Sequence, residues 1–130
     1  MSKLVAWQTP FQTRQFPSVS IEADGQLDKT TIFIGFPAEW QINFDSVVGV
    51  KVCDESYDNN PRFHVTRDID GLCSYMWDDS PWLEDFNGKH FEAIYNTRLR
   101  HFVLLGGDYN VEVLAAGDAS IKGVNFNAGN

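Results

Sequence analysis

The chain has few basic residues, and this shortage excludes two classes of partner. Ten Lys and Arg stand against eighteen Asp and Glu, which gives a formal net charge of −8 over 130 residues. Binding to nucleic acid and docking on an anionic membrane both depend on Lys and Arg, so we expect neither. A basic protein partner is compatible with this acidity, and so is a plain role in solubility.

Cysteine and long apolar runs are also scarce. Cys53 and Cys73 lack CxxC spacing and have no cysteine or histidine neighbours at zinc-finger intervals. No secretory signal opens the chain, and no apolar run approaches the roughly 18 residues of a membrane span. We therefore expect a cytoplasmic protein in which both cysteines are buried free thiols rather than a disulfide.

The residues that are abundant indicate a β-rich globular domain. Hydrophobic residues make up 43% of the chain and aromatic residues 14%, and large rings favour sheets. We expect one domain over residues 1–130, with 117–130 as a partly ordered tail. Strands are predicted within 19–23, 30–36, 40–53, 72–77, 98–105 and 109–114. Apolar and polar residues alternate in 19–23, 40–53 and 109–114, whereas 30–36 is β-branched and apolar on both faces.

The predicted fold class is mainly β. About eight short strands separated by turns indicate an antiparallel β-sandwich or an open barrel with one short helix. The last two strands read as a hairpin. Residues 40–53 form either one bent strand or two short ones, because Ser46 breaks the alternation and Gly49 favours a bulge or a bend.

One stretch, residues 74–86, combines four aromatic rings with four carboxylates and contains no basic residue. Ser80 followed by Pro81 and acidic residues predicts a helix start, with Ser80 as the N-cap. The stretch ends a segment, 54–85, that holds nine acids and only two bases, whereas the rest of the chain is close to neutral. Nearly all of the excess negative charge therefore belongs to this segment.

Aromatic rings among carboxylates suit a basic protein surface, because rings anchor and charges steer. The plainer alternative is that Trp77 and Trp82 belong to the core and the acids are their solvated neighbours. On the first interpretation the partner-binding residues are Asp54, Glu55, Asp58, Asp78, Asp79, Trp82, Glu84 and Asp85.

No motif for catalysis or metal binding emerges from the sequence. Residues 54–65 fail as a calcium loop, because the required glycine and the final glutamate are missing. His64, His90 and His101 follow no HxH or HExxH pattern, so a metal site would need them to converge from separate strands. Adjacent carboxylates on a strand point to opposite faces, which argues against a glycosidase pair. We predict no catalytic residue, metal or cofactor, and leave open whether the chain is an enzyme.

Four stretches, 40–44, 50–55, 79–83 and 100–114, resemble small bacterial β-rich proteins, some of which are immunity proteins that block polymorphic or contact-dependent toxins. The resemblance covers roughly residues 30–115 and consists of structural motifs, so it carries no catalytic residue over. It implies a non-enzymatic binding protein that masks a basic toxin surface, in particular that of a nuclease. The rival hypothesis is a cupin- or lipocalin-like barrel that binds a small ligand or a metal. A third is an oligomeric module that associates through an apolar strand edge.

Overall fold

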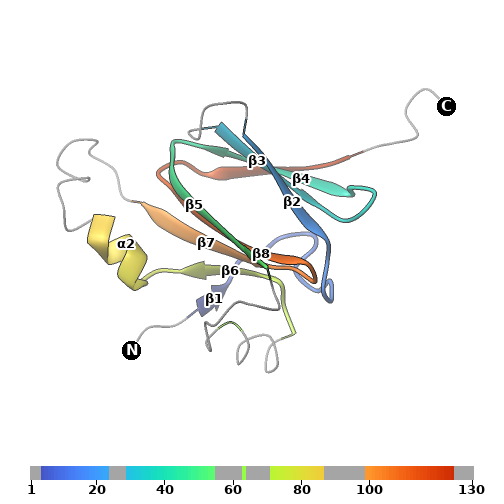
Figure 1. Ribbon diagram of the computed structural model, residues 1–130, viewed down its shortest axis with the longest axis horizontal. Coiled ribbons are helices and arrows are strands. Elements are labelled where there is room, and N and C mark those ends of the chain that lie inside the picture. The colour runs from blue at the N-terminus through green and yellow to red at the C-terminus, as the bar shows by residue number, and fades with distance from the viewer. Residues whose placement is uncertain (1–3, 24–28, 55–62, 64–70, 87–98, 125–130) are drawn as a thin grey trace.

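Two antiparallel sheets pack face to face (Figure 1). The computed structural model describes residues 4–23, 29–54, 63, 71–86 and 99–124. The five-stranded sheet has the order β1 (Leu4–Ala6), β6 (Ser74–Trp77), β7 (Arg100–Leu105), β8 (Tyr109–Ala115) and β5 (Val47–Asp54). The four-stranded sheet has the order β2 (Val19–Ala23), β3 (Lys29–Ile34), β4 (Trp40–Asp45) and β9 (Ala119–Gly123). The predicted mainly β fold is confirmed, and of the two predicted architectures it is the sandwich.

Alternation along the strands builds the core between the sheets. In the four-stranded sheet, Ile32 and Ile34 on β3 and Phe44 on β4 point inward and are fully buried. They meet inward residues of the other sheet, among them Phe102, whose ring centroid lies 5.1 Å from that of Phe44. Burial of these side chains stabilises the fold by about 1.5–3 kcal/mol each.

Between β4 and β5 the chain passes from one sheet to the other through a single residue, Ser46. β4 ends at Asp45 in one sheet and β5 begins at Val47 in the other, and Ser46 between them has φ 56°. This left-handed conformation is rare for a residue with a side chain and turns the backbone sharply. Of the two interpretations of residues 40–53, the pair of short strands is therefore the correct one.

The predicted hairpin of β7 and β8 is confirmed, and its register determines which residues share a face. His101 lies opposite Leu114, and Val103 lies opposite Glu112. Phe102 on β7 points into the core between the sheets, so its neighbours His101 and Val103 point to the other face of the five-stranded sheet. Every residue of β7 after Arg100 is buried, which means that this outer face is covered as well.

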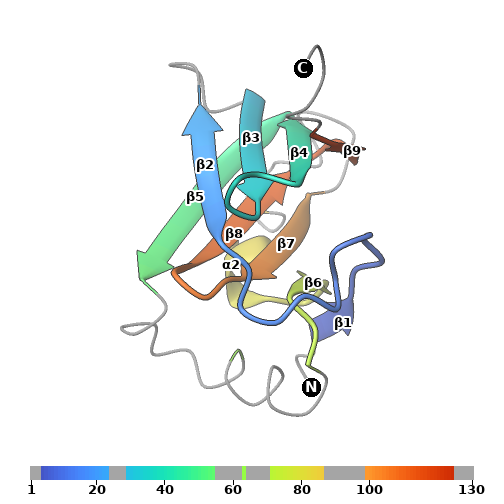
Figure 2. The same ribbon diagram turned by 90° about the vertical axis from the view of Figure 1, so that its right-hand side faces the viewer.

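The short helix α2 (Pro81–Phe86) covers part of that outer face, on the side away from the four-stranded sheet (Figure 2). Leu83 packs with Leu114 of β8 and with Leu99, just before β7. The backbone N–H of Leu83 donates to Ser80 Oγ at 3.0 Å, which confirms the predicted N-cap. Phe63, the one described residue of its segment, packs on the same face beside Trp77.

The segment 117–130, which the sequence predicts to be partly ordered, contains strand β9. β9 pairs with β4 along its whole length, so the described part of the predicted tail belongs to a sheet.

Both cysteines are free, as predicted, and Cys73 is buried. Cys53 is only half-buried, because it lies on β5 at the edge of its sheet, so the prediction of two buried thiols is wrong for this residue. Among the described residues no helix has the length and apolar character needed to cross a membrane.

Candidate functional site

Helix α2 presents its acids to solvent because its other face is apolar. Leu83 is buried and Trp82 and Phe86 are half-buried against the five-stranded sheet, whereas Glu84 and Asp85 are exposed. Asp78 and Asp79 form the exposed turn that leads from β6 into the helix. We call the four exposed carboxylates Asp78, Asp79, Glu84 and Asp85 the acidic turn. They lie within eight consecutive residues, at the edge of a helix fixed to the sheet.

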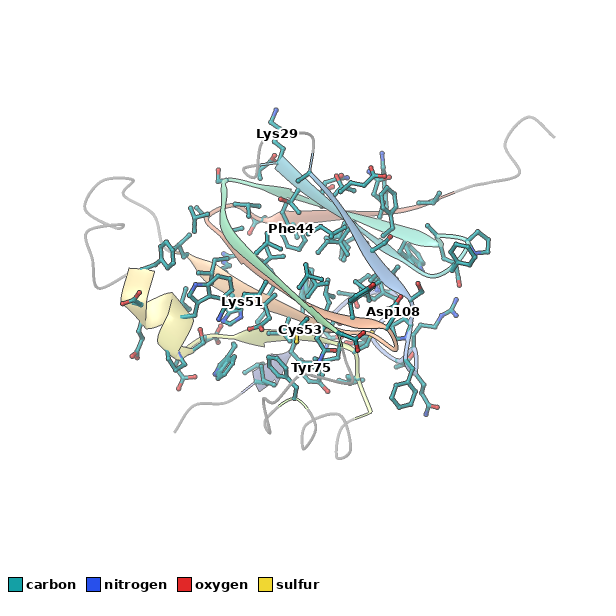
Figure 3. The ribbon with its side chains drawn as sticks, in the orientation of Figure 1. Lys29, Phe44, Lys51, Cys53, Tyr75 and Asp108 are labelled. Atoms are coloured by element: carbon teal, nitrogen blue, oxygen red, sulfur yellow. The ribbon has the colours of Figure 1, made fainter. Side chains whose placement is uncertain are left out.

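Trp82 holds the helix in place by filling space that is open because residue 49 is a glycine. A Cβ atom on Gly49 would lie 2.7 Å from Cζ2 of Trp82, a distance that real Cβ atoms do not tolerate. On the same strand, Lys51 is labelled in Figure 3. Its Nζ lies 4.3 Å from the centroid of the Trp82 ring, which is a cation–π contact. The β5–β8 register shifts between Val47 and Gly49, which confirms the predicted bulge. The indole therefore packs directly against Gly49, on the strand that carries the bulge.

Beneath Trp82 lies a buried imidazole with partners on both ring nitrogens. Nδ1 of His101 is 2.6 Å from Ser80 Oγ, and Nε2 is 2.9 Å from Oε1 of Glu112. The imidazole stacks on Trp77 at 5.4 Å and meets the edge-on Trp82 at 5.2 Å, both between centroids. Buried polar groups are stable only when they are hydrogen-bonded, and each nitrogen of this ring has a partner. We call Ser80, His101 and Glu112 the histidine network.

The chemistry of the acceptor assigns the hydrogen between His101 and Glu112. An ionised carboxylate only accepts, so Nε2 of His101 carries the hydrogen that is donated to Glu112. Between Nδ1 and Ser80 Oγ the donor depends on the form of the ring: a neutral ring accepts from the hydroxyl, and a charged ring donates to it. The same Ser80 oxygen accepts the N–H of Leu83. One chain of hydrogen bonds therefore links the first turn of α2, through the imidazole, to strand β8.

Serine, histidine and glutamate are also the residue types of a nucleophilic triad, but this arrangement does not support that chemistry. A nucleophile needs an oxygen that a substrate can reach, whereas Ser80 is 0% exposed and His101 is 1% exposed. The Ser80 oxygen is in addition occupied as the cap of α2. The network is therefore a means of positioning the helix and its acidic turn.

The structure brings together only part of the predicted binding set. Asp78, Asp79, Glu84 and Asp85 are gathered in the acidic turn, and Trp82 is half-buried beneath it. Asp54 is exposed at the far end of β5, paired with Tyr109. It lies five residues from Gly49, about 16 Å along a strand, so it does not join the acidic turn. Glu55 and Asp58 lie outside the described residues.

Of the three histidines that a metal site would have to bring together, only His101 lies among the described residues. His64 and His90 lie outside the described residues. His101 is engaged by Ser80 and Glu112. In the described part of the chain no three residues of the metal-binding types come together.

Sequence reasoning missed the histidine network, although part of its signal was visible. The hairpin 98–105 and 109–114 was predicted, and a register that pairs His101 with Leu114 places Glu112 diagonally across from the imidazole. The contribution of Ser80 was not accessible in this way, because it depends on how α2 packs onto the sheet.

The fold and site together define the class of protein: an antiparallel β-sandwich with an acidic helix anchored on one outer face. Comparison of this chain with family models, with curated proteins and with solved structures finds no match.

Proposed function

We propose that the chain is a non-enzymatic, cytoplasmic binding protein whose acidic turn docks on a basic protein surface. The observation that carries the proposal is the concentration of charge. Residues 54–85 account for nearly all of the net charge of −8, and four of their carboxylates are exposed together on the acidic turn. Carboxylates held in fixed positions attract a basic partner from a distance and restrict the orientation in which it binds.

The anchoring of the helix supports this role in binding. A surface that is ordered before binding does not lose conformational freedom when the complex forms, so more of the contact energy appears as affinity. Trp82, packed against Gly49, and the histidine network, with one buried and one part-buried hydrogen bond, hold α2 in place. Trp82 itself is half-buried, so only its exposed part is available to contact the partner. The rest of its surface packs against the sheet and holds the helix.

The particular function proposed is that of an immunity-type inhibitor that masks a basic toxin surface, above all a nuclease site that otherwise receives phosphates. Carboxylates can occupy such a site because they present negative oxygens, as phosphates do. The test uses the purified protein encoded by the gene immediately upstream, the position expected of a toxin gene. Its association with this chain is measured by stopped-flow mixing at low and at physiological salt.

Two variants with equal charge change separate a local effect from a general one. Asp78→Lys with Glu84→Lys alters the acidic turn, and Glu22→Lys with Asp45→Lys alters exposed acids of the four-stranded sheet. Each substitution adds two positive charges, so both variants carry −4 in place of −8. We expect the first pair to slow association about tenfold at low salt and the second about twofold. Equal slowing by both pairs would assign the effect to net charge and remove the acidic turn from the proposal.

A further inference from the structure

The turn between β3 and β4 exposes an aromatic ring that no described element covers. Phe36 is 93% exposed, next to Gly35, whose φ is +98°. A side chain at position 35 would be strained at this φ, and its Cβ would lie 3.2 Å from the backbone nitrogen of Glu39. The glycine therefore allows a tight turn that projects Phe36 outward. A Phe side chain that is 93% exposed buries little area within the monomer, so its ring is available for a contact outside it.

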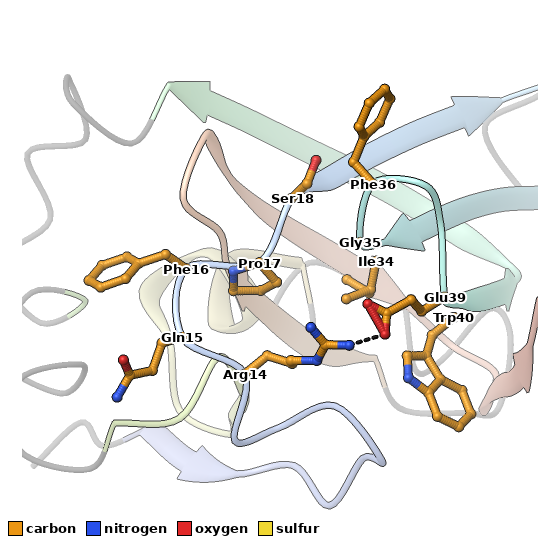
Figure 4. Close-up of a pocket in the computed structure, with 10 residues that line it drawn as sticks. All are labelled: Arg14, Gln15, Phe16, Pro17, Ser18, Ile34, Gly35, Phe36, Glu39 and Trp40. Carbon is orange, nitrogen blue, oxygen red and sulfur yellow. Dashed lines mark hydrogen bonds and ion pairs between the residues drawn. The ribbon is translucent and has the colours of Figure 1, made fainter.

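A pocket lies beside this ring and is not filled by it. The pocket has a volume of about 260 Å³, and its apolar lining includes Phe16, Pro17, Ile34 and Trp40. Figure 4 shows the ring of Phe36 directed away from the pocket that its own residue borders. An apolar cavity of about 150 Å³ is enough to bind benzene, so this pocket has room for a phenylalanine ring.

The charges at the pocket identify which occupant suits it. Arg14 and Glu39 are the charged residues of its lining, and they form an ion pair with each other. The lining of the pocket therefore carries no net charge, in a chain of net charge −8. Two such chains repel one another, and they approach at least cost through a neutral face. A basic partner would gain nothing from this face, because the acidic turn lies at the other end of the molecule (Figure 1).

From these observations we infer that the face is a two-fold interface between copies of this chain. Because the ring and the pocket are neighbours, a two-fold rotation between them places each Phe36 in the pocket of the other copy. The same rotation brings Arg14 of each copy toward Glu39 of the other, so the charges are self-complementary. The two acidic turns then point outward, and each dimer presents two of them.

The interface is small, so association is concentration-dependent. Stable interfaces bury about 800 Å² on each partner, and one exposed ring with its rim supplies a fraction of that. The experiment is sedimentation velocity on the full chain from about 5 µM to about 500 µM, the range in which weak interfaces associate. We expect the mass to rise from 14.7 kDa toward twice that value. A monomeric mass over the whole range would overturn the inference.

Four variants test the arrangement itself. Phe36→Ser is expected to keep the chain monomeric, whereas Val52→Ser, a control at an exposed residue of β5, leaves association unchanged. Glu39→Arg places arginines of the two copies opposite one another and is expected to weaken association at least tenfold. Adding Arg14→Glu to this variant is expected to restore association. Equal melting temperatures show that the variants are folded. A dimer that persists in Phe36→Ser, or a charge swap without restoration, would overturn the arrangement.

Discussion

Replacing His101 by leucine is expected to lower the free energy of unfolding by about 3 kcal/mol. Leucine matches the imidazole in size, so the cost does not come from a cavity. It comes from Ser80 and Glu112, which lose the hydrogen bonds that compensate their burial. Glu112 is the costlier of the two, because its charge then lies largely buried with no hydrogen-bonded partner in place of the imidazole. Urea unfolding followed by circular dichroism measures the change.

The double variant His101→Leu with Glu112→Leu separates this explanation from a simple loss of packing. If the unpaired carboxylate causes most of the damage, removing it makes the double variant less destabilised than the sum of the two single variants by about 1–2 kcal/mol. Strict additivity would show that the carboxylate and the imidazole do not act as a pair, and would remove the histidine network from the account of how α2 is held.

Gly49→Ala is expected to cost about 2 kcal/mol, because the added methyl group overlaps the ring of Trp82. The matched control is Gly123→Ala on β9, where the nearest atom to a Cβ is Cζ3 of Trp40 at an ordinary 3.8 Å. That change is expected to stay within about 0.5 kcal/mol. Thermal unfolding compares the two.

The clash itself can be tested by removing the ring. In a Trp82→Leu background the indole is absent, so Gly49→Ala should cost only a few tenths of a kcal/mol. An undiminished cost in that background would mean that the backbone at position 49, and not the indole, requires glycine.

Local signals in the sequence were sufficient for most of the fold. Ser80 and Pro81 predicted where α2 begins, and Ser46 predicted a break that the structure shows as a change of sheet. Each of these features acts on its immediate neighbours, because a cap satisfies nearby N–H groups and a broken alternation reverses the face of a strand. They therefore remain visible in the order of residues alone.

Contacts across the fold could not be predicted in this way. Gly49 was predicted to favour a bulge, but its further role as a seat for Trp82 depends on a helix more than thirty residues away. The prediction that Asp54 belongs with the acidic turn failed for the same reason. Asp54 lies at the far end of the eight-residue strand β5, away from the end that contacts α2. Phe36 also went unnoticed, because the predicted strand 30–36 included it, whereas β3 ends at Ile34 and the following turn exposes the ring.

The anchored helix and the neutral face have different roles in this account. Trp82 and the histidine network hold the acidic turn in place. The turn between β3 and β4, which carries the exposed Phe36, lies at the end of the molecule opposite to α2 (Figure 1). Substitutions at one end therefore leave the other unchanged. Loss of dimerisation would leave binding by the acidic turn intact, and reversal of the acidic turn would leave dimerisation intact, so the two proposals stand or fall separately.

The most direct test of the central claim reverses all four carboxylates of the acidic turn to lysine, at Asp78, Asp79, Glu84 and Asp85, and measures association with the upstream-encoded protein across a series of salt concentrations. The account predicts a loss of association rate of well over tenfold at low salt, which narrows as salt screens the charges. An association rate that equals that of the unaltered chain at every salt concentration would contradict the claim that this surface binds the partner.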